Sequence, residues 1–198
     1  MSNEKKINPC KVITSGDVRW SYVNVWEPKS PDGVSAPKYS VQLIISKDDK
    51  VTLTAIGKAI NAAYEEGKSL LSDKNGRLPA LKSLKQPMRD GDEEYPDKEE
   101  YKNAYFLNCS SVNKPDVVDI NIQPILDRSE VYSGVYGRVS INFYAFNKDG
   151  NKGIAVGLNN MQKIKDGEPL GSRATAQEDF ASPSADAETG AGALPFGF

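Results

Sequence analysis

The sequence predicts a mainly β protein: a small antiparallel barrel of the Greek-key type with one inserted helix, long loops and a C-terminal tail. Three observations support this prediction. About six segments alternate apolar and polar residues at the two-residue period of a strand. Only one stretch, after the second of these segments, has a helical period, so there is no repeated strand–helix–strand pattern. From residue 172 onward, alanine, serine, threonine and glycine dominate.

The first strand region covers residues 11–26 and bends near Gly16, where glycine allows a bulge or coil. In its second half, alternation places five residues on one face: Val18, Trp20, Tyr22, Asn24 and Trp26. Large rings usually belong to a core, which is the expectation for Trp26, whereas Trp20 and Tyr22 suit a core or an exposed surface equally. After a loop rich in proline and glycine, residues 38–46 alternate again and predict the antiparallel partner strand.

A helix is predicted after the second strand. Asp48 or Asp49 can cap its start, and Gly67 marks its end. Between them, apolar residues recur at intervals of three and four: Ala55, Ile56, Ala59, Ile60, Ala63 and Tyr64. We therefore expect an amphipathic helix that packs on the sheet.

Residues 70–101 have no regular period and form a long insert. Its first part is basic, with Arg77, Lys82, Lys85 and Arg89, and the part from residue 90 is acidic. Because a loop of this length within a compact domain is usually functional or mobile, the basic part is a candidate to run along a phosphate backbone. The acidic part is expected to be a solvated face. Two short strands follow, over residues 104–111 and 117–123, joined by a turn at residues 113–116.

The longest strand pattern covers residues 136–147. One face is small and apolar: Gly137, Val139, Ile141, Phe143 and Ala145. The other face carries rings, an arginine and short polar groups: Tyr136, Arg138, Ser140, Asn142, Tyr144 and Phe146. Asp149 and Gly150 then supply a hairpin turn, so residues 153–161 can return antiparallel.

The mixed face suits a ligand that is both flat and anionic, as single-stranded nucleic acid is. Aromatic rings stack on bases, and arginine binds phosphate or stacks as a cation. The alternative for each single ring is that it covers a second hydrophobic layer. We take four rings as candidates for base stacking and four cations as candidates for the backbone: Trp20, Tyr22, Tyr136 and Tyr144, and Arg19, Lys38, Arg128 and Arg138.

The composition excludes several kinds of catalysis. The chain has no histidine, which removes Ser-His-Asp and Cys-His catalysis and the commonest zinc ligand. It has no glycine-rich phosphate-binding motif, and we expect no cofactor. Cys10 and Cys109 lack CxxC spacing and are expected to be free thiols in a reducing compartment. No apolar run is long enough to span a bilayer and no signal peptide is visible, so we expect a cytoplasmic protein without membrane contact.

Residues 172–198 differ in composition from the rest. They hold one basic and four acidic residues, against 24 basic and 23 acidic residues before them. Such a segment cannot bury enough apolar surface to offset its ordering entropy, so we expect a disordered acidic tail after a domain of residues 1–171. Its acids are expected to compete with DNA for a basic groove. Its end is an apolar hook that suits a groove on a partner protein: Leu194, Pro195, Phe196 and Phe198.

Two other functions stay open. A metal-dependent nuclease would use Asp32 and Asp48, which loosely match the PD and (D/E)xK elements that hold magnesium. An adaptor would act through the tail alone. A homodimer is also open, through an exposed strand edge or the rings of Trp26 and Phe146.

Six stretches occur in a distinctive order: RWSYVNVWEP, KYSVQLIISKDD, QPMRDGDE, KPDVVD, SEVYSGVYGRVSINFYAFN and KGIAVGLNNMQKIKDGEPLG. This order resembles that of the phage-encoded single-stranded DNA-binding proteins of the OB-fold type. The resemblance implies an OB-fold and non-catalytic, sequence-tolerant binding of single strands in replication or recombination, in the host cytoplasm. The end of the chain also resembles the acidic proline–phenylalanine tips that recruit replication and repair enzymes, but it adds Gly197 and Phe198.

Overall fold

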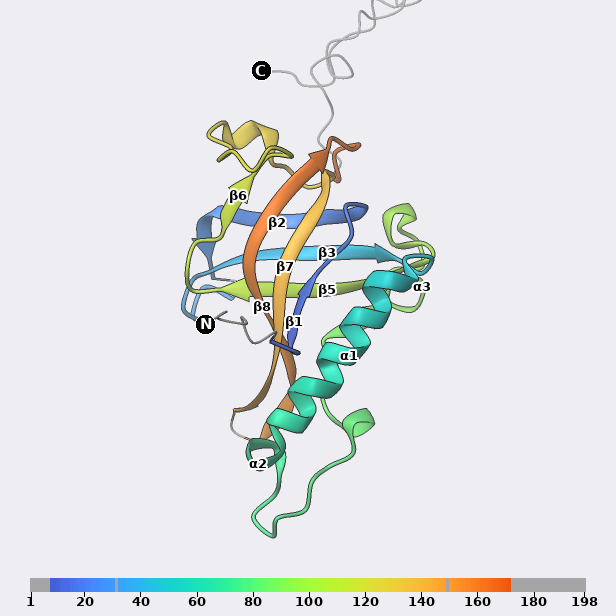
Figure 1. Ribbon diagram of the computed structural model, residues 1–198, viewed down its shortest axis with the longest axis vertical. Coiled ribbons are helices and arrows are strands. Elements are labelled where there is room, and N and C mark those ends of the chain that lie inside the picture. Colours follow the sequence, from blue (N-terminus) through green and yellow to red (C-terminus); the bar gives the residue numbers. More distant parts are fainter. Residues whose placement is uncertain (1–7, 31, 149, 172–198) are drawn as a thin grey trace, which may run out of the picture.

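Five strands close into a barrel in the computed structural model, which describes residues 8–30, 32–148 and 150–171 (Figure 1). They are β2 (Val18–Lys29), β3 (Lys38–Ser46), β5 (Ala104–Ser111), β7 (Tyr136–Lys148) and β8 (Asn151–Lys165). The strands pair in the order β7-β2-β3-β5-β8, and β8 pairs again with β7. All of these pairs are antiparallel except β5 with β8, which is parallel. This is the Greek-key barrel of an OB-fold, and it confirms the predicted fold class.

Smaller elements extend the barrel. They are the strands β1 (Lys11–Ile13), β4 (Met88–Asp90) and β6 (Asp116–Val118), the helices α1 (Lys50–Glu66), α2 (Lys68–Leu71) and α3 (Gly91–Glu94), and the 3-10 helices η1 (Leu81–Ser83), η2 (Glu99–Tyr101) and η3 (Arg128–Glu130). β1 pairs with β7, β4 with β5, and β6 with β8. In the described ranges, no helix is long and apolar enough to cross a bilayer. The predicted tail, with its hook, lies outside the described residues.

The core fills the interior of the barrel. Its largest member is Trp20, which is fully buried and packs against β7 at Gly137. A Cβ atom at Gly137 would lie 2.5 Å from Cζ2 of Trp20, so the indole can pack this closely only on a glycine. Val139, Ile141 and Phe143 are buried on the same side of β7, as the alternation of that strand predicts.

β2 changes its inward face at Tyr22. Ser21 pairs with Gln42 and Asn24 pairs with Ser40, so two residues of β2 stand opposite one residue of β3. This is a β-bulge, and Tyr22 adopts a φ of 47° within it. Before the bulge Trp20 points inward, and after it Val25 does. The prediction that Trp20, Tyr22 and Asn24 share one face is therefore wrong.

Helix α1 follows the prediction. Asp49 caps its start by accepting a hydrogen bond from the backbone N–H of Thr52 at 3.0 Å, and Gly67 follows its last residue. The helix buries Ile56, Ala59 and Ala63 and packs along β7 and β1 (Figure 1).

The strand predicted over residues 117–123 is shorter in the structure. The carboxylate of Asp119 accepts hydrogen bonds from the backbone N–H groups of Asn121 and Gln123, both at 2.8 Å. These bonds turn the chain, and Ile122 adopts a φ of 64°. The strand β6 therefore ends at Val118.

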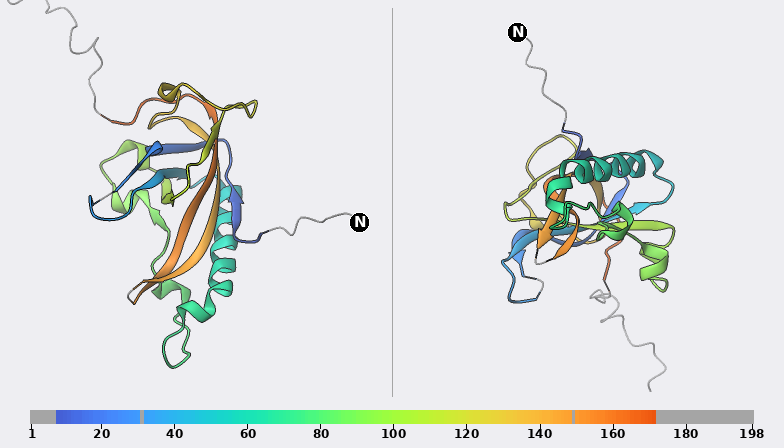
Figure 2. Two further views of the ribbon diagram at one scale, coloured as in Figure 1. Left: turned by 90° about the vertical axis from the view of Figure 1, so that its left-hand side faces the viewer. Right: turned by 90° about the horizontal axis from the view of Figure 1, so that it is seen from below.

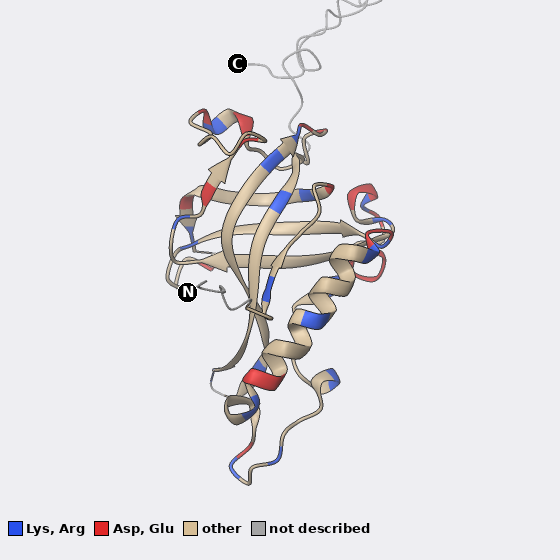
Figure 3. Ribbon diagram, viewed as in Figure 1, with Lys and Arg blue, Asp and Glu red and all other residues tan. Residues whose placement is uncertain are grey.

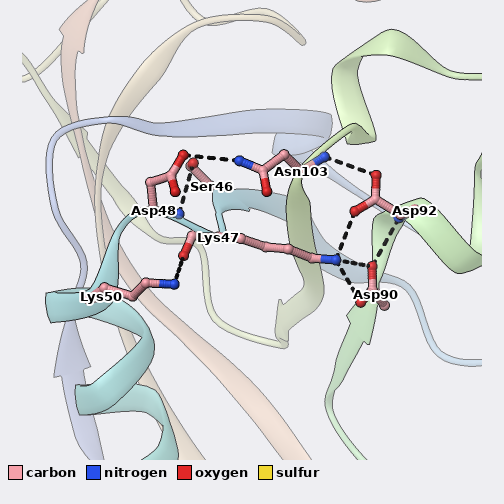
Figure 4. Close-up of polar contacts among 7 residues, drawn as sticks. All are labelled: Ser46, Lys47, Asp48, Lys50, Asp90, Asp92 and Asn103. Carbon is pink, nitrogen blue, oxygen red and sulfur yellow. Dashed lines mark hydrogen bonds and ion pairs between the residues drawn. The ribbon is translucent and has the colours of Figure 1, made fainter.

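A polar network fixes the acidic part of the insert to the end of β3 (Figure 4). The ammonium of Lys47 lies 2.7 Å from carboxylate oxygens of both Asp90 and Asp92. Asn103 joins this network by donating its backbone N–H to Asp92 at 2.9 Å and its side-chain amide to Asp48 at 3.0 Å. The hydrogen bond from Lys47 holds the pKa of Asp92 below its usual range. The insert is thereby held over the outer face of β3 and β5.

An aromatic cluster packs the insert against the barrel. The rings of Tyr95, Tyr101 and Phe106 have centroids 4.5–5.4 Å apart and pack on Ile44. Burial raises the pKa of Tyr101 to about 12. The insert thus closes one end of this face of the barrel and leaves the other end open.

This raised pKa predicts how stability changes at alkaline pH. In the unfolded chain a tyrosine has a pKa of about 10, so between about pH 10 and 12 only the unfolded state loses its proton. The free energy of unfolding should then fall as the pH rises through this window, and Tyr101→Phe should lack that part of the fall. Urea unfolding of both proteins at about pH 9 and about pH 11 measures it. Equal losses in the two proteins would contradict the prediction.

Candidate nucleic-acid interface

The outer face of β3 and β5 is hollowed into two adjoining pockets of about 650 and 370 Å³. Both are lined by Asn108 and Ser110, so they form one continuous depression, which we call the barrel groove. The first pocket reaches the β2–β3 loop and the second reaches the β7–β8 hairpin. Figure 2 shows both of these segments projecting from the barrel. The barrel groove therefore lies on the strand face and between the loops where OB-folds bind oligonucleotides.

Polar, uncharged residues pair across the floor of the barrel groove. Ser40 pairs across the strands with Ser110, and Gln42 pairs with Asn108. The amide of Gln42 is buried and satisfied at both ends, because it accepts from the hydroxyl of Tyr101 and donates to Asn108 at 3.0 Å. This floor can form hydrogen bonds to base edges without repelling a negative ligand.

Aromatic rings stand at the two ends of the barrel groove. Tyr22 is 57% exposed at one end, and Tyr144 is 43% exposed at the other, next to the half-buried Phe146. The backbone of Tyr22 is left-handed, a conformation that costs of order 1–3 kcal/mol in a residue other than glycine. The amide of Asn24 supports it by donating to the carbonyl of Tyr22 at 3.0 Å. The bulge thus turns a large ring out of the barrel, as expected at a binding site.

The charged residues that line the barrel groove are all basic. They are Lys29, Lys38, Lys85 and Arg89. In the described ranges, none of the three lysines lies within 4.0 Å of a carboxylate. The guanidinium of Arg89 lies 4.5 Å from the ring centre of Phe106 and donates to Glu94 at 2.8 Å. A groove with these charges, in a chain whose net charge is −2, favours an anion.

Three of the eight predicted site residues line the barrel groove: Tyr22, Lys38 and Tyr144. Trp20 does not, because its indole is sealed in the core, so the prediction that it stacks on a base is wrong. Arg19 lies outside the groove as well. Its guanidinium donates to the carbonyl of Glu168 at 2.7 Å and to that of Gly134 at 3.4 Å, which holds the segment after β8.

The other three predicted residues also lie elsewhere. Tyr136 is flanked by Arg19 and Lys165, whose cationic groups lie 5.5 and 4.9 Å from its ring centre. Arg138 lines a separate pocket with Ile13 and Val118, and Arg128 pairs with Glu27 at 2.9 Å. Tyr136 and Tyr144 share a strand face but are eight residues apart, a separation of about 27 Å. The eight candidate residues therefore do not line one groove.

Several groove residues were absent from the predicted set. Lys85 and Arg89 belong to the basic part of the insert, which its charge had made a separate candidate for contact with a phosphate backbone. Phe146 alternates with Tyr144, and it could have been found by the same pattern. Asn108 gave no signal, because a single asparagine within a strand has many structural roles.

The residues of the nuclease alternative lie apart. Asp32 precedes β3 and Asp48 follows it, and a strand of nine residues spans about 30 Å. The carboxylate of Asp32 accepts hydrogen bonds from the loop itself, foremost from Ser35, which hold its pKa well below its usual range. In the part of the chain that the structure describes, no three histidine, cysteine, aspartate or glutamate residues are grouped to hold a metal ion. The pair cannot share one magnesium ion.

A family model described as the single-stranded DNA-binding protein of Enterobacter phage Enc34 matches residues 10–190. The chain belongs to this family. The Enc34 protein in complex with single-stranded DNA aligns with a TM-score of 0.66 and 28% identity, covering 82% of this chain and 90% of that chain. A C-terminal truncation of the Enc34 protein aligns with a TM-score of 0.63 and 26% identity, covering 81% and 89%. The resemblance stated from the sequence is thus confirmed.

The fold of this chain is also similar to that of gp2.5, a single-stranded DNA-binding protein encoded by bacteriophage T7. It aligns with a TM-score of 0.58 and 14% identity, covering 92% of this chain and 98% of that chain, and this likeness concerns the fold alone. No match was found among curated proteins.

Proposed function

We propose that the chain binds single-stranded DNA without cleaving it, in the replication or recombination of phage DNA. Bases stack on Tyr22 and Tyr144, and phosphates lie against Lys29, Lys38, Lys85 and Arg89. The observation that carries this proposal is the barrel groove itself, which has an exposed ring at each end and only cations among its charged lining residues. Membership of the Enc34 family, and the relative solved with single-stranded DNA, support the same ligand.

The geometry explains a preference for unpaired strands. A ring can stack on any base whose face is free, so binding tolerates sequence, whereas the bases of a duplex are already stacked and paired. The neutral floor formed by Ser40, Asn108 and Ser110 adds hydrogen bonds that do not require one particular base. The lysines bind through phosphates, and their contribution is therefore weakened by salt.

A titration of a fluorescent oligonucleotide at several salt concentrations tests the proposal. Four phosphate contacts on a single strand predict a slope of roughly −2.8 in log affinity against log salt. A duplex of equal length should bind more weakly at every salt concentration. Binding that does not depend on salt, or tighter binding of the duplex, would contradict the proposal.

Glu94 is expected to oppose DNA binding. Its carboxylate lies 2.8 Å from the guanidinium of Arg89, which lines the barrel groove, so a phosphate must compete with it. Glu94→Gln should tighten binding by about 0.2–1 kcal/mol, the usual range for an exposed ion pair. Glu65→Gln, which removes an ion pair of the helix region, is the control and should leave affinity unchanged. Weaker binding by Glu94→Gln would exclude this competition.

We also propose that residues 172–198 compete with DNA and recruit partner proteins. The support is the sequence alone: acidic residues followed by the hook of Leu194, Pro195, Phe196 and Phe198. Deleting residues 172–198 should tighten or preserve oligonucleotide binding, and a large loss of affinity would rule out the competition.

A further inference from the structure

A basic segment leaves the barrel groove and follows the β7–β8 hairpin. This segment, which we call the basic loop, comprises residues 72–89. At Lys85 it pairs with β8: its N–H donates to the carbonyl of Lys152 at 3.1 Å, and its carbonyl accepts from Ile154 at 3.0 Å. A Cβ atom at Gly153 would lie 2.6 Å from the carbonyl oxygen of Lys85, so this contact requires glycine. The basic loop is therefore attached to the hairpin.

A second contact fixes the other end of the basic loop. The ammonium of Lys152 on β8 donates to the carbonyl oxygens of Leu71 and Ser72, both at 2.9 Å. The hollow between these two attachments has a volume of about 640 Å³, and Arg77, Ser83 and Gly150 are among its lining residues. It lies at the tip of the hairpin, with Lys85 and its neighbours between it and the barrel groove.

The charge of the basic loop is strongly one-sided. It contains five cations and one acid: Lys74, Arg77, Lys82, Lys85 and Arg89, and Asp73. The carboxylate of Asp73 accepts the backbone N–H groups of Asn75 and Arg77, so it is used within its own turn. Within the described ranges, no carboxylate lies within 4.0 Å of the cationic groups of Lys74, Arg77 or Lys82. Figure 3 shows basic positions along the loop at the end of the molecule where Figure 1 labels α2.

We propose that a single strand longer than the barrel groove continues along the basic loop toward the tip of the hairpin, with its phosphates against Lys74, Arg77 and Lys82. This inference rests on the proposed function, since Lys85 and Arg89 belong both to the groove and to the loop. The basic loop has no aromatic residue, so the extension binds the phosphate backbone and adds no base preference. The hairpin thus sets the length of strand that one molecule covers.

The test compares two lengths of oligothymidine, about 6 and about 20 nucleotides, within the range of known OB-fold sites and above it. The triple variant Lys74→Gln, Arg77→Gln, Lys82→Gln should bind the short strand like the wild type. For the long strand, the variant's slope of log affinity against log salt should be less steep by about 2. Each lost phosphate contact on a single strand removes about 0.7 from this slope. The side chains of Lys74 and Lys82 are exposed and that of Arg77 makes no hydrogen bond within the described ranges, so folding should be unaffected.

A matched triple variant controls for net charge. Lys11→Gln, Lys50→Gln, Lys58→Gln removes three exposed lysines on β1 and α1 and should change neither slope. Equal slopes for the basic-loop variant and the wild type on the long strand would overturn the extension. An equal loss of slope on the short and the long strand would overturn it as well. If the basic-loop variant binds the long strand normally but no longer binds polyglutamate as the wild type does, the result would overturn the extension and assign the loop to an acidic protein partner. A wild type that binds neither length would refute the proposed function itself.

Discussion

Replacing both Tyr22 and Tyr144 by alanine is expected to weaken binding of single-stranded DNA by at least about 30-fold. Each base–ring contact contributes about 1–3 kcal/mol, so the loss of two corresponds to about 2–6 kcal/mol. Both residues are exposed and neither belongs to the core, so the double variant should unfold at close to the same denaturant concentration as the wild type. Oligothymidine titration at one salt concentration measures the effect.

Tyr136→Ala is the matched control for this prediction. Tyr136 lies on the same face of β7 as Tyr144, but its ring is flanked by Arg19 and Lys165 and lies outside the barrel groove. Tyr136→Ala should leave the affinity for oligothymidine unchanged within about twofold, which corresponds to less than about 0.5 kcal/mol. A larger loss from Tyr136→Ala than from the double variant would place the DNA on a different wall of the barrel.

Trp20→Ala is expected to lower the free energy of unfolding by about 3–5 kcal/mol. The indole is fully buried, and β7 approaches it through Gly137, so its removal leaves a cavity that the barrel cannot fill. Urea unfolding measures the change. The variant should bind DNA normally wherever it remains folded, because Trp20 does not line the barrel groove.

Trp20→Phe separates packing from hydrogen bonding. In the described part of the chain, the indole N–H of Trp20 has no hydrogen-bond partner, so phenylalanine loses apolar contacts only. It should destabilise the protein clearly less than alanine does. Weakened DNA binding with unchanged stability, in either variant, would contradict the assignment of Trp20 to the core.

The elements that local chemistry determines could be predicted from the sequence. The cap at Asp49, the end of α1 at Gly67 and the turn between β7 and β8 each depend on a few neighbouring residues. The strand over residues 38–46 follows directly from its alternation. The bulge at Tyr22 could not be predicted, because nothing in the local sequence marks where β2 inserts an extra residue opposite β3. This single extra residue separates Trp20, which enters the core, from Tyr22, which lines the barrel groove.

The barrel groove was harder to predict than the strands that form it. Its lining combines Tyr22 on β2, Arg89 on the insert and Tyr144 on the far half of a 13-residue strand. These residues come together only once the barrel has closed and β4 has paired with β5. Alternation indicates the face of a strand on which a side chain lies. Because a long strand twists, residues on one face of it can belong to different surfaces of the protein.

Photocrosslinking tests the central claim most directly. An oligothymidine in which single positions carry 5-iodouracil reacts with aromatic side chains that stack on the base, and mass spectrometry identifies the attached residue. The barrel groove predicts crosslinks to Tyr22 and Tyr144. Crosslinks to Tyr136, with none to those two residues, would contradict the claim that single-stranded DNA lies in the barrel groove.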